Sequence, residues 1–210
     1  MRPMFTGIVK GLFPVGEVKK HSDLTQYQII LPEPMRVGLE MGASVSIDGV
    51  CQSVVQIEGD QVWFDAIEET LNRTTLGQLY VGRRVNVERS ARMGDEIGGH
   101  LLSGHVFGKA RVCEIQTLEN HSQFTFECDP QWMKYFFTKG YVAIDGASLT
   151  LVDVRAGQFS VHLIPETLRV TTLGFKRVGD EVNIEFDSQT QAIVDTVERV
   201  LGLQKLFPQT

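Results

Sequence analysis

The chain has 210 residues and a formal net charge of −6, with 42% hydrophobic and 22% charged residues. This length allows one large domain or two small ones, each with a modest core. The acidic balance and the lack of a Lys/Arg-rich stripe argue against a nucleic acid or an anionic membrane surface as partner. No apolar run approaches the ~20 residues of a membrane span.

The N-terminus and the cysteines bear on location. Residues 1–9 read MRPMFTGIV, without the long apolar region or the small-residue cleavage site of a secretory signal. Cys51, Cys113 and Cys128 form an odd set with no CxxC pair. Such a set argues against a disulfide framework or a zinc site. We therefore expect a cytoplasmic protein that binds no metal.

The first half of the chain reads as a series of short strands. Runs rich in Val, Ile, Phe and Thr, separated by Gly, Asp and Asn turns, predict strands at residues 25–31, 43–55, 61–67 and 83–89. A short helix is expected within residues 33–42. Short strands at regular spacing are typical of a β-barrel or a β-sandwich.

The second half repeats the first. A shift of 97 positions carries Ile47-Asp48-Gly49 onto Ile144-Asp145-Gly146, and Val85–Glu88 onto Val182–Glu185. The repeated pattern predicts strands at residues 124–129, 141–152, 158–164 and 180–186, with a short helix within 130–140. The period is too long for a solenoid and fits a whole small domain. We therefore predict an all-β protein with two tandem domains, residues 1–100 and 101–188.

The C-terminal segment departs from the repeat. In residues 187–207, Ile193, Val197 and Leu201 recur at helical spacing, with charged residues on the opposite face. This pattern predicts an amphipathic helix at residues 189–207 that has no counterpart after the first copy. The pattern alone does not decide whether the helix packs on its own barrel or joins subunits.

Small polar side chains recur at equivalent strand positions in the two copies. Cys51 and Ser53 share one strand face, and so do their counterparts Ser148 and Thr150. A single such pair is most simply barrel filling. Because the pair occurs twice, we expect a ligand pocket in each copy. Duplication for stability alone would not explain why Cys51 became Ser148.

Two further repeated stretches are expected to line the same mouths. They are the glycine-led segments at 7–9 and 104–106, and the strand ends at 65–70 and 164–169. No P-loop or GxGxxG motif follows a strand, so the ligand is expected to be flat, polar and not a phosphate. His100 and His105 lie in a Gly-rich linker. Either a structural or a functional role fits them, but their spacing without a third ligand argues against a metal.

These motifs together resemble one enzyme family. MFTGIV, IDGVC, ETLNRTTLG, VNVER, DEIGGHLLSGHV, KGYVAIDGASLTLV, HLIPETLRVTTLG and QAIVDTVERVL are similar to riboflavin synthase of the alpha type. The resemblance extends from Met4 to about Leu203. It implies two six-stranded Greek-key barrels, a C-terminal trimerisation helix and a homotrimer whose sites lie between subunits.

The resemblance also implies a reaction that needs no cofactor. Two molecules of 6,7-dimethyl-8-ribityllumazine would dismutate to riboflavin and 5-amino-6-ribitylaminouracil. On this reading each copy holds one substrate, and the identical substrates explain the repeat. A proton must leave the C7 methyl group of one lumazine, and a nucleophile must add at C7 of the other, so the two pockets cannot stay chemically identical.

The site residues follow from the same resemblance. It assigns polar catalytic or proton-transfer roles to Cys51, Ser44, His105, Ser148 and Asp187, while Phe5 is expected to shield the reacting pair. The expected substrate-binding set is Phe5, Gly7, Ile8, Val9, Cys51, Gln52, Ser53, Asp65, Ala66, Ile67, Glu68, Glu69, Thr70, Gly104, His105, Val106, Lys139, Ser148, Leu149, Thr150, Ile164, Pro165, Glu166, Thr167, Leu168 and Arg169.

Two departures and two rival functions remain. Gln52 stands where many members carry Leu, and Phe107 where many carry Asp. The first rival is a lumazine- or flavin-carrying antenna protein, which would bind the ligand without turnover. The second is a β-barrel that binds oligosaccharide or nucleic acid, which the acidic charge disfavours.

Overall fold

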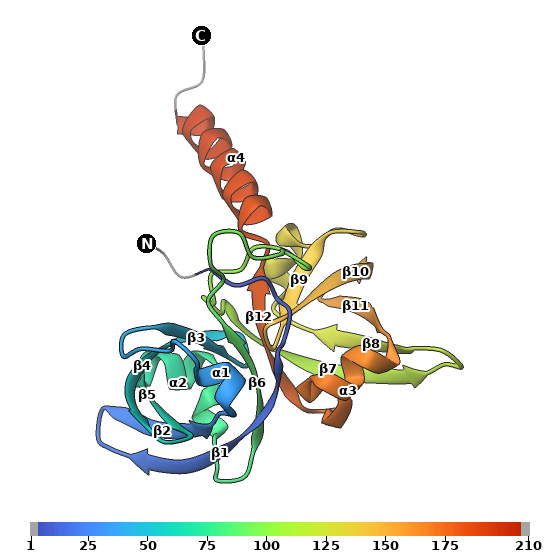
Figure 1. The fold of residues 1–210 in the computed structure, drawn as a ribbon. Coiled ribbons are helices and arrows are strands. Elements are labelled where there is room, and N and C mark those ends of the chain that lie inside the picture. The colour runs from blue at the N-terminus through green and yellow to red at the C-terminus, as the bar shows by residue number, and fades with distance from the viewer. Residues whose placement is uncertain (1–3, 207–210) are drawn as a thin grey trace.

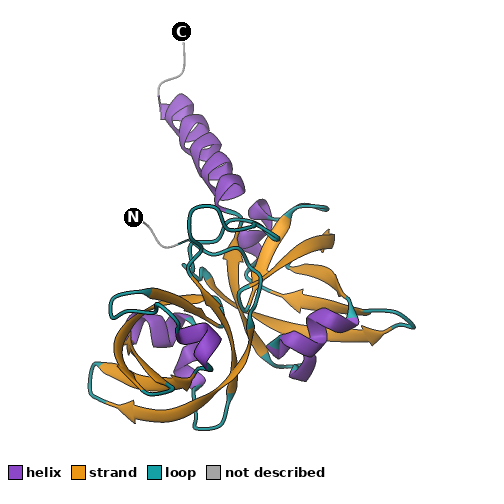
Figure 2. Cartoon of the chain, in the orientation of Figure 1, coloured by secondary structure: helices purple, strands orange, loops and turns teal. Residues whose placement is uncertain are grey.

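The computed structural model describes residues 4–206, with side chains as far as Gly202. Strands dominate it and form two closed antiparallel barrels that lie side by side (Figures 1 and 2). The first barrel consists of β1 (Gly11–Lys20), β2 (Leu24–Ile30), β3 (Ser44–Ile47), β4 (Val50–Glu58), β5 (Gln61–Ile67) and β6 (Arg84–Arg89), with α1 (Glu33–Arg36), α2 (Glu68–Arg73) and the 3₁₀ helix η1 (Thr75–Gln78).

The second barrel repeats this order. It consists of β7 (Gly108–Thr117), β8 (Ser122–Glu127), β9 (Tyr141–Ile144), β10 (Ala147–Arg155), β11 (Gln158–Leu163) and β12 (Glu181–Phe186), with η2 (Pro130–Tyr135), α3 (Pro165–Val170) and η3 (Thr172–Phe175). The neighbour order β1-β2-β5-β4-β3-β6 has its counterpart in β7-β8-β11-β10-β9-β12. Two six-stranded barrels related by internal duplication are therefore confirmed.

Alternating side chains close each barrel around an apolar core. In β5, Val62 and Phe64 are fully buried in the first core, and in β11 Phe159 and Val161 take the same positions in the second. The face that carries Val50, Gln52 and Val54 also points inward. Gln52 is 6% exposed, and its amide oxygen accepts a hydrogen bond from the Tyr27 hydroxyl at 3.2 Å. This partner lets a polar residue occupy the core.

Strands β1 and β7 are absent from the sequence-based prediction. The segment GLFPVGEVKK contains Pro14 and two glycines and ends in two lysines, so its local signal for a strand is weak. It forms a strand because β2 and β6 pair with it on both sides. The short helices expected within 33–42 and 130–140 appear as α1 and η2.

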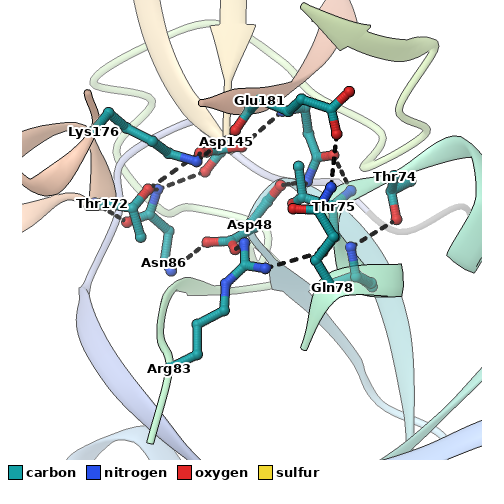
Figure 3. Close-up of polar contacts among 12 residues, drawn as sticks. Asp48, Thr74, Thr75, Gln78, Arg83, Asn86, Asp145, Thr172, Lys176 and Glu181 are labelled. Carbon is teal, nitrogen blue, oxygen red and sulfur yellow. Dashed lines mark hydrogen bonds and ion pairs between the residues drawn. The ribbon is translucent and has the colours of Figure 1, made fainter. Parts of the chain in front are cut away.

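The barrels meet across an approximate twofold axis built from buried polar groups (Figure 3). The side-chain oxygen of Asn183 accepts from the Thr75 amide at 2.8 Å, and that of Asn86 accepts from the Thr172 amide at 2.8 Å. The side-chain nitrogens donate to the carbonyls of Asp48 and Asp145 at 2.7 and 2.8 Å. Each barrel thus satisfies backbone groups of the other.

Two buried carboxylates lie in this network. Arg83 pairs with Asp48 and Lys176 with Asp145, both at 3.1 Å. The cations come from non-equivalent positions, because Asp180 is the counterpart of Arg83. Burial raises the pKa of Asp48 to about 7, reinforced by Asp145 and opposed by Arg83, by the Asn86 amide and by Lys176.

This raised pKa predicts a pH effect on stability. A carboxyl whose pKa is higher in the folded state favours folding at low pH, and that contribution is lost as the pH rises from about 4 through about 7. Replacing Asp48 by asparagine removes the titration. We expect the difference in free energy of unfolding, Asp48→Asn minus the unmodified chain, to become more positive as the pH rises from 5 to 8. Urea denaturation measures it at each pH. A difference that is flat across this range would contradict the assignment.

The helix α4 (Ser188–Leu206) projects away from the second barrel (Figure 1). Asp187 begins it by accepting hydrogen bonds from the amide and hydroxyl of Thr190 at 2.8 and 2.7 Å. Near its base, Tyr135 donates to Asp195 at 2.6 Å. Within the described residues, no helix is long and apolar enough to cross a membrane.

Candidate functional site

The segment that precedes each barrel, around Gly7 and around Gly104, pairs with a strand of the other barrel. Phe5 and Leu102 form an antiparallel bridge with N–O distances of 2.8 and 2.9 Å. Beyond this bridge, the Gly7 carbonyl accepts from the Ser148 amide at 2.9 Å. Reciprocally, the Gly104 carbonyl accepts from the Cys51 amide at 2.8 Å. The second residue of each pocket strand, Cys51 in β4 and Ser148 in β10, is therefore paired with the segment that precedes the other barrel.

Two buried glutamates hold these crossing segments. Glu88 accepts from the amide and hydroxyl of Thr6, both at 2.7 Å, and from the Gly7 amide at 3.0 Å. Glu185 makes the same three contacts with Ser103 and Gly104 at 2.7, 2.8 and 3.0 Å. Burial raises the pKa of both glutamates, although these hydrogen bonds oppose the shift. The glycines at 7 and 104 have φ of 74° and 76°, and a Cβ there would lie 2.5 or 2.6 Å from the Cβ of Ser148 or Cys51.

The first candidate site lies outside the barrel wall at the start of β4. Cys51 and Ser53 point outward, and Ser44 pairs with Ser53 across the β3–β4 ladder. A cavity of about 280 Å³ opens here, lined by Val50, Cys51, Glu69, Thr70, Arg73, Thr74, Gly104, His105 and Val106. Residues expected from three separate stretches thus meet around one cavity.

The Cys51 thiol is protonated in this setting. Burial raises its pKa, a hydrogen bond with Ser44 lowers it, and the charge of Glu185 raises it again. The net shift is upward from an ordinary value already above neutrality. At neutral pH, Cys51 therefore offers a polarizable S–H group rather than a thiolate.

The second candidate site lies at the equivalent start of β10 and contains a histidine. His100 Nδ1 lies 2.6 Å from Ser148 Oγ, and the imidazole stacks on Tyr141 with ring centroids 5.2 Å apart. His100 is 7% exposed, and its Nε2 has no partner among the described residues. Burial lowers its pKa, while the charge of Asp187 opposes the shift. A neutral imidazole here can accept the Ser148 hydroxyl proton.

The twin sites differ in their key side chains. Cys51 corresponds to Ser148, and Ser44 corresponds to Tyr141, so the second site has an aromatic wall where the first has a small hydroxyl. Lys139 has φ of 71°, and its counterpart Gly42 has φ of 82°. A left-handed conformation is unfavourable for lysine. The second copy therefore places a cation where local backbone geometry favours glycine.

The other expected site residues fall into three groups. The exposed group lies at the junctions of β5 with α2 and of β11 with α3; it contains Asp65, Ile67, Glu68, Glu69, Ile164, Pro165, Glu166 and Arg169, together with Ile8, Ser53, His105, Lys139 and Thr150 elsewhere. The half-buried group contains Val9, Thr70 and Thr167. The side chains of Gln52, Ala66, Val106, Leu149 and Leu168 pack in or against the cores, and Phe5 is buried at the axis.

Sequence reasoning left two residues out of the expected site set. The Gly-rich linker gives no information on which barrel His100 meets, and Tyr141 lies in a run whose pattern predicts only a strand. Comparing the copies would have identified Tyr141, because the equivalent Ser44 was itself an expected site residue. The only feature of the sequence that indicates a role for His100 is the pair of glycines before it, which lets the linker approach Ser148 closely.

Known proteins are similar to this chain in sequence. The Lumazine binding domain family matches residues 6–90 and 103–187. The chain is 51% identical to "Riboflavin synthase" of Escherichia coli (strain K12) over 96% of this chain and 95% of that protein. It is 44% identical to "Riboflavin synthase" of Chlamydia pneumoniae over 95% of this chain and 98% of that protein.

Solved structures resemble the fold as well. LumP complexed with riboflavin superposes with a TM-score of 0.80 at 27% identity, covering 87% of this chain and 98% of that one. LumP complexed with 6,7-dimethyl-8-(1'-D-ribityl) lumazine superposes with a TM-score of 0.77 at 28% identity, covering 86% and 98%.

Proposed function

Because the chain belongs to the riboflavin synthase family, with two lumazine-binding domains, we propose that its two barrels hold the two substrates of one reaction. That reaction is the dismutation of two 6,7-dimethyl-8-ribityllumazine molecules to riboflavin and 5-amino-6-(D-ribitylamino)uracil. One lumazine transfers a four-carbon unit to the other. The observation that carries the proposal is the pair of equivalent but chemically unequal sites at Cys51 and Ser148.

The unequal sites suit the unequal roles of the substrates. One lumazine must lose a proton from its C7 methyl group, and the other must be attacked at C7. We assign the neutral His100–Ser148 pair, whose atoms lie 2.6 Å apart, to proton transfer beside the second-barrel substrate. Cys51 and Ser44 supply neutral hydrogen-bonding groups beside the other substrate. The two products together contain all the atoms of the two substrates, so no redox partner is needed.

The proposal is tested by supplying the lumazine alone. Purified protein incubated with 6,7-dimethyl-8-ribityllumazine is expected to produce riboflavin, followed by its absorbance, and one equivalent of the aminouracil product. The structural likeness to LumP, which was solved with this lumazine bound, makes binding without turnover the other outcome. Tight lumazine binding without any riboflavin formation would contradict the proposed enzyme activity and indicate a protein that only binds the lumazine.

We further propose a homotrimer in which the first barrel of one subunit faces the second barrel of its neighbour. The support is α4, which projects from the body and exposes Ile193, Val197, Val200 and Leu201 at 45–65% of their surface. An exposed apolar stripe of this kind favours association. The free thiols of Cys51, Cys113 and Cys128 support a cytoplasmic location.

Removing α4 is expected to separate the subunits. A chain that ends at Asp187 should sediment as a monomer and lose riboflavin formation, while each barrel retains lumazine binding by fluorescence titration. The matched control is Arg199→Ala, which alters α4 away from its apolar stripe. A truncated chain that remains trimeric would exclude α4 as the assembly element.

Lys139 provides a prediction that separates function from stability. Lys139→Gly relieves a left-handed lysine and is expected to leave the free energy of unfolding unchanged or raised by up to about 1 kcal/mol. Because Lys139 is an expected substrate contact, kcat/KM should fall by at least about tenfold. Both quantities are measured on the same preparation. The control is Gly42→Lys, which should destabilise the first barrel.

A further inference from the structure

The second barrel has a hollow on its outer wall, separate from both candidate sites. Its volume is about 210 Å³, and its lining is Glu114, Gln116, Gln123, Thr125, Asp153, Arg155, Gln158, Phe159 and Ser160. Asp153 follows Ser148 by five residues on β10, which places it roughly 15 Å further along the strand. The hollow therefore belongs to the sheet face formed by β7, β8, β10 and β11 and not to the Ser148 site.

The first barrel fills the equivalent position with an indole. Ser160 pairs with Thr125 and Asp153, and its counterpart Trp63 pairs with Gln28 and Gln56 in the same register, including the same bulge. Trp63 is 5% exposed, although it lies on the outer face of the barrel. Lys19 covers its ring at 4.3 Å. Matching registers place the hollow beside Ser160 where the first barrel carries the Trp63 indole.

The lining indicates what kind of ring would fit. Nearly every side chain around the hollow is polar, and Glu114 and Asp153 against Arg155 leave an excess of one negative charge. Ser160 is 2% exposed, and its hydroxyl has no hydrogen-bond partner among the described residues. A buried hydroxyl without a partner is costly. Gln116 takes the position of Lys19 and would lie over the occupant.

From these observations we infer that the hollow at Ser160 is a binding site for a flat, uncharged, amino-substituted fused heterocycle the size of indole. The ring would occupy the volume that Trp63 fills in the first barrel. Asp153 already pairs with Arg155 at 2.7 Å and Glu114 accepts from Gln116 at 2.7 Å, so the donors of the ring would face the second oxygen of each carboxylate. A ring nitrogen would accept the Ser160 hydroxyl. Anionic ligands are disfavoured by the two carboxylates.

Free adenine is the probe, because it has the fused five- and six-membered rings of indole and one amino group. Isothermal titration of the intact protein, with riboflavin in excess to occupy flavin-binding sites, is expected to show one adenine per chain. Ser160→Trp should fill the hollow and weaken binding by at least about tenfold. No adenine binding at millimolar concentration would overturn the inference, and so would unchanged binding by a folded Ser160→Trp.

The first barrel offers a matched control. Trp63→Ser opens the equivalent hollow, in which Gln56 takes the place of Asp153, so this variant is expected to bind a second adenine per chain, more weakly than the first. It tests the inference even if Ser160→Trp does not fold. Thermal melting establishes that each variant is folded before titration. A folded Trp63→Ser protein that still binds one adenine would contradict the idea that a missing fused ring defines the site.

Discussion

Asn183→Ala is expected to lower the free energy of unfolding by about 3–5 kcal/mol, the largest effect on stability of the substitutions considered. Asn183 is 1% exposed and joins the barrels through three hydrogen bonds: from the Thr75 amide at 2.8 Å, to the Asp48 carbonyl at 2.7 Å and to the Thr75 hydroxyl at 2.9 Å. Alanine leaves a buried amide and a buried carbonyl without partners, and each costs about 1–3 kcal/mol. Denaturation in urea measures the loss.

Two variants control this experiment. Asn86→Ala removes the twofold-related contacts and should cost a similar amount. Gln78 also crosses between the barrels, donating to Glu181 at 2.7 Å, but it does so at the surface. Gln78→Ala should therefore cost less than about 1 kcal/mol. If Asn183→Ala cost no more than Gln78→Ala, the axis network would not be a major source of stability.

His100→Gln is expected to reduce kcat by roughly 10²–10⁴-fold, the usual contribution of a positioned acid or base. Glutamine can still bond to Ser148 but cannot take a proton from it. The His100 pKa lies below its ordinary value, so the acid limb of the pH–rate profile is expected below pH ~6.5. In His100→Gln this limb should disappear, which a merely structural role would not cause.

The control for His100 is its neighbour. Tyr141→Phe keeps the ring that stacks on His100 at 5.2 Å, so kcat should change by less than about threefold. Tyr141→Ser copies the Ser44 position of the first barrel and should lower kcat without removing the acid limb. A His100→Gln enzyme with normal turnover and an unchanged pH profile would exclude His100 from proton transfer.

The sequence predicts two β domains because their strand signal is duplicated, while the choice of barrel over sandwich comes from the family resemblance. Each strand run appears at two places 97 positions apart, so chance patterns are excluded by the common offset. Strand β1 escapes prediction because Pro14 and Gly16 weaken its local preference, and only the flanking strands β2 and β6 determine its conformation. Tertiary pairing overrides propensity there.

The arrangement of the site is harder to predict than its composition. Cys51, Thr70 and Gly104 are expected site residues, and they do line one cavity. The exchange of segments cannot be predicted from the sequence. Gly7 and Gly104 occupy equivalent positions of the repeat, and this equivalence would be the same if each glycine packed on its own barrel. The same ambiguity hides the meeting of His100 with Ser148, which depends on a linker that returns to the opposite barrel.

The exchanged segments also bear on the origin of the molecule. A barrel of this kind, encoded alone, would leave the Cys51 amide of its β4 strand without the carbonyl that Gly104 supplies. A single-barrel ancestor could complete this pairing only as a dimer in which the two copies exchange their N-terminal arms. The bridge between Phe5 and Leu102, which are themselves equivalent positions, would then have been a contact between two identical arms. Fusion of two such copies would make the exchange of arms permanent, and the two halves could then diverge at the positions of Cys51 and Ser148.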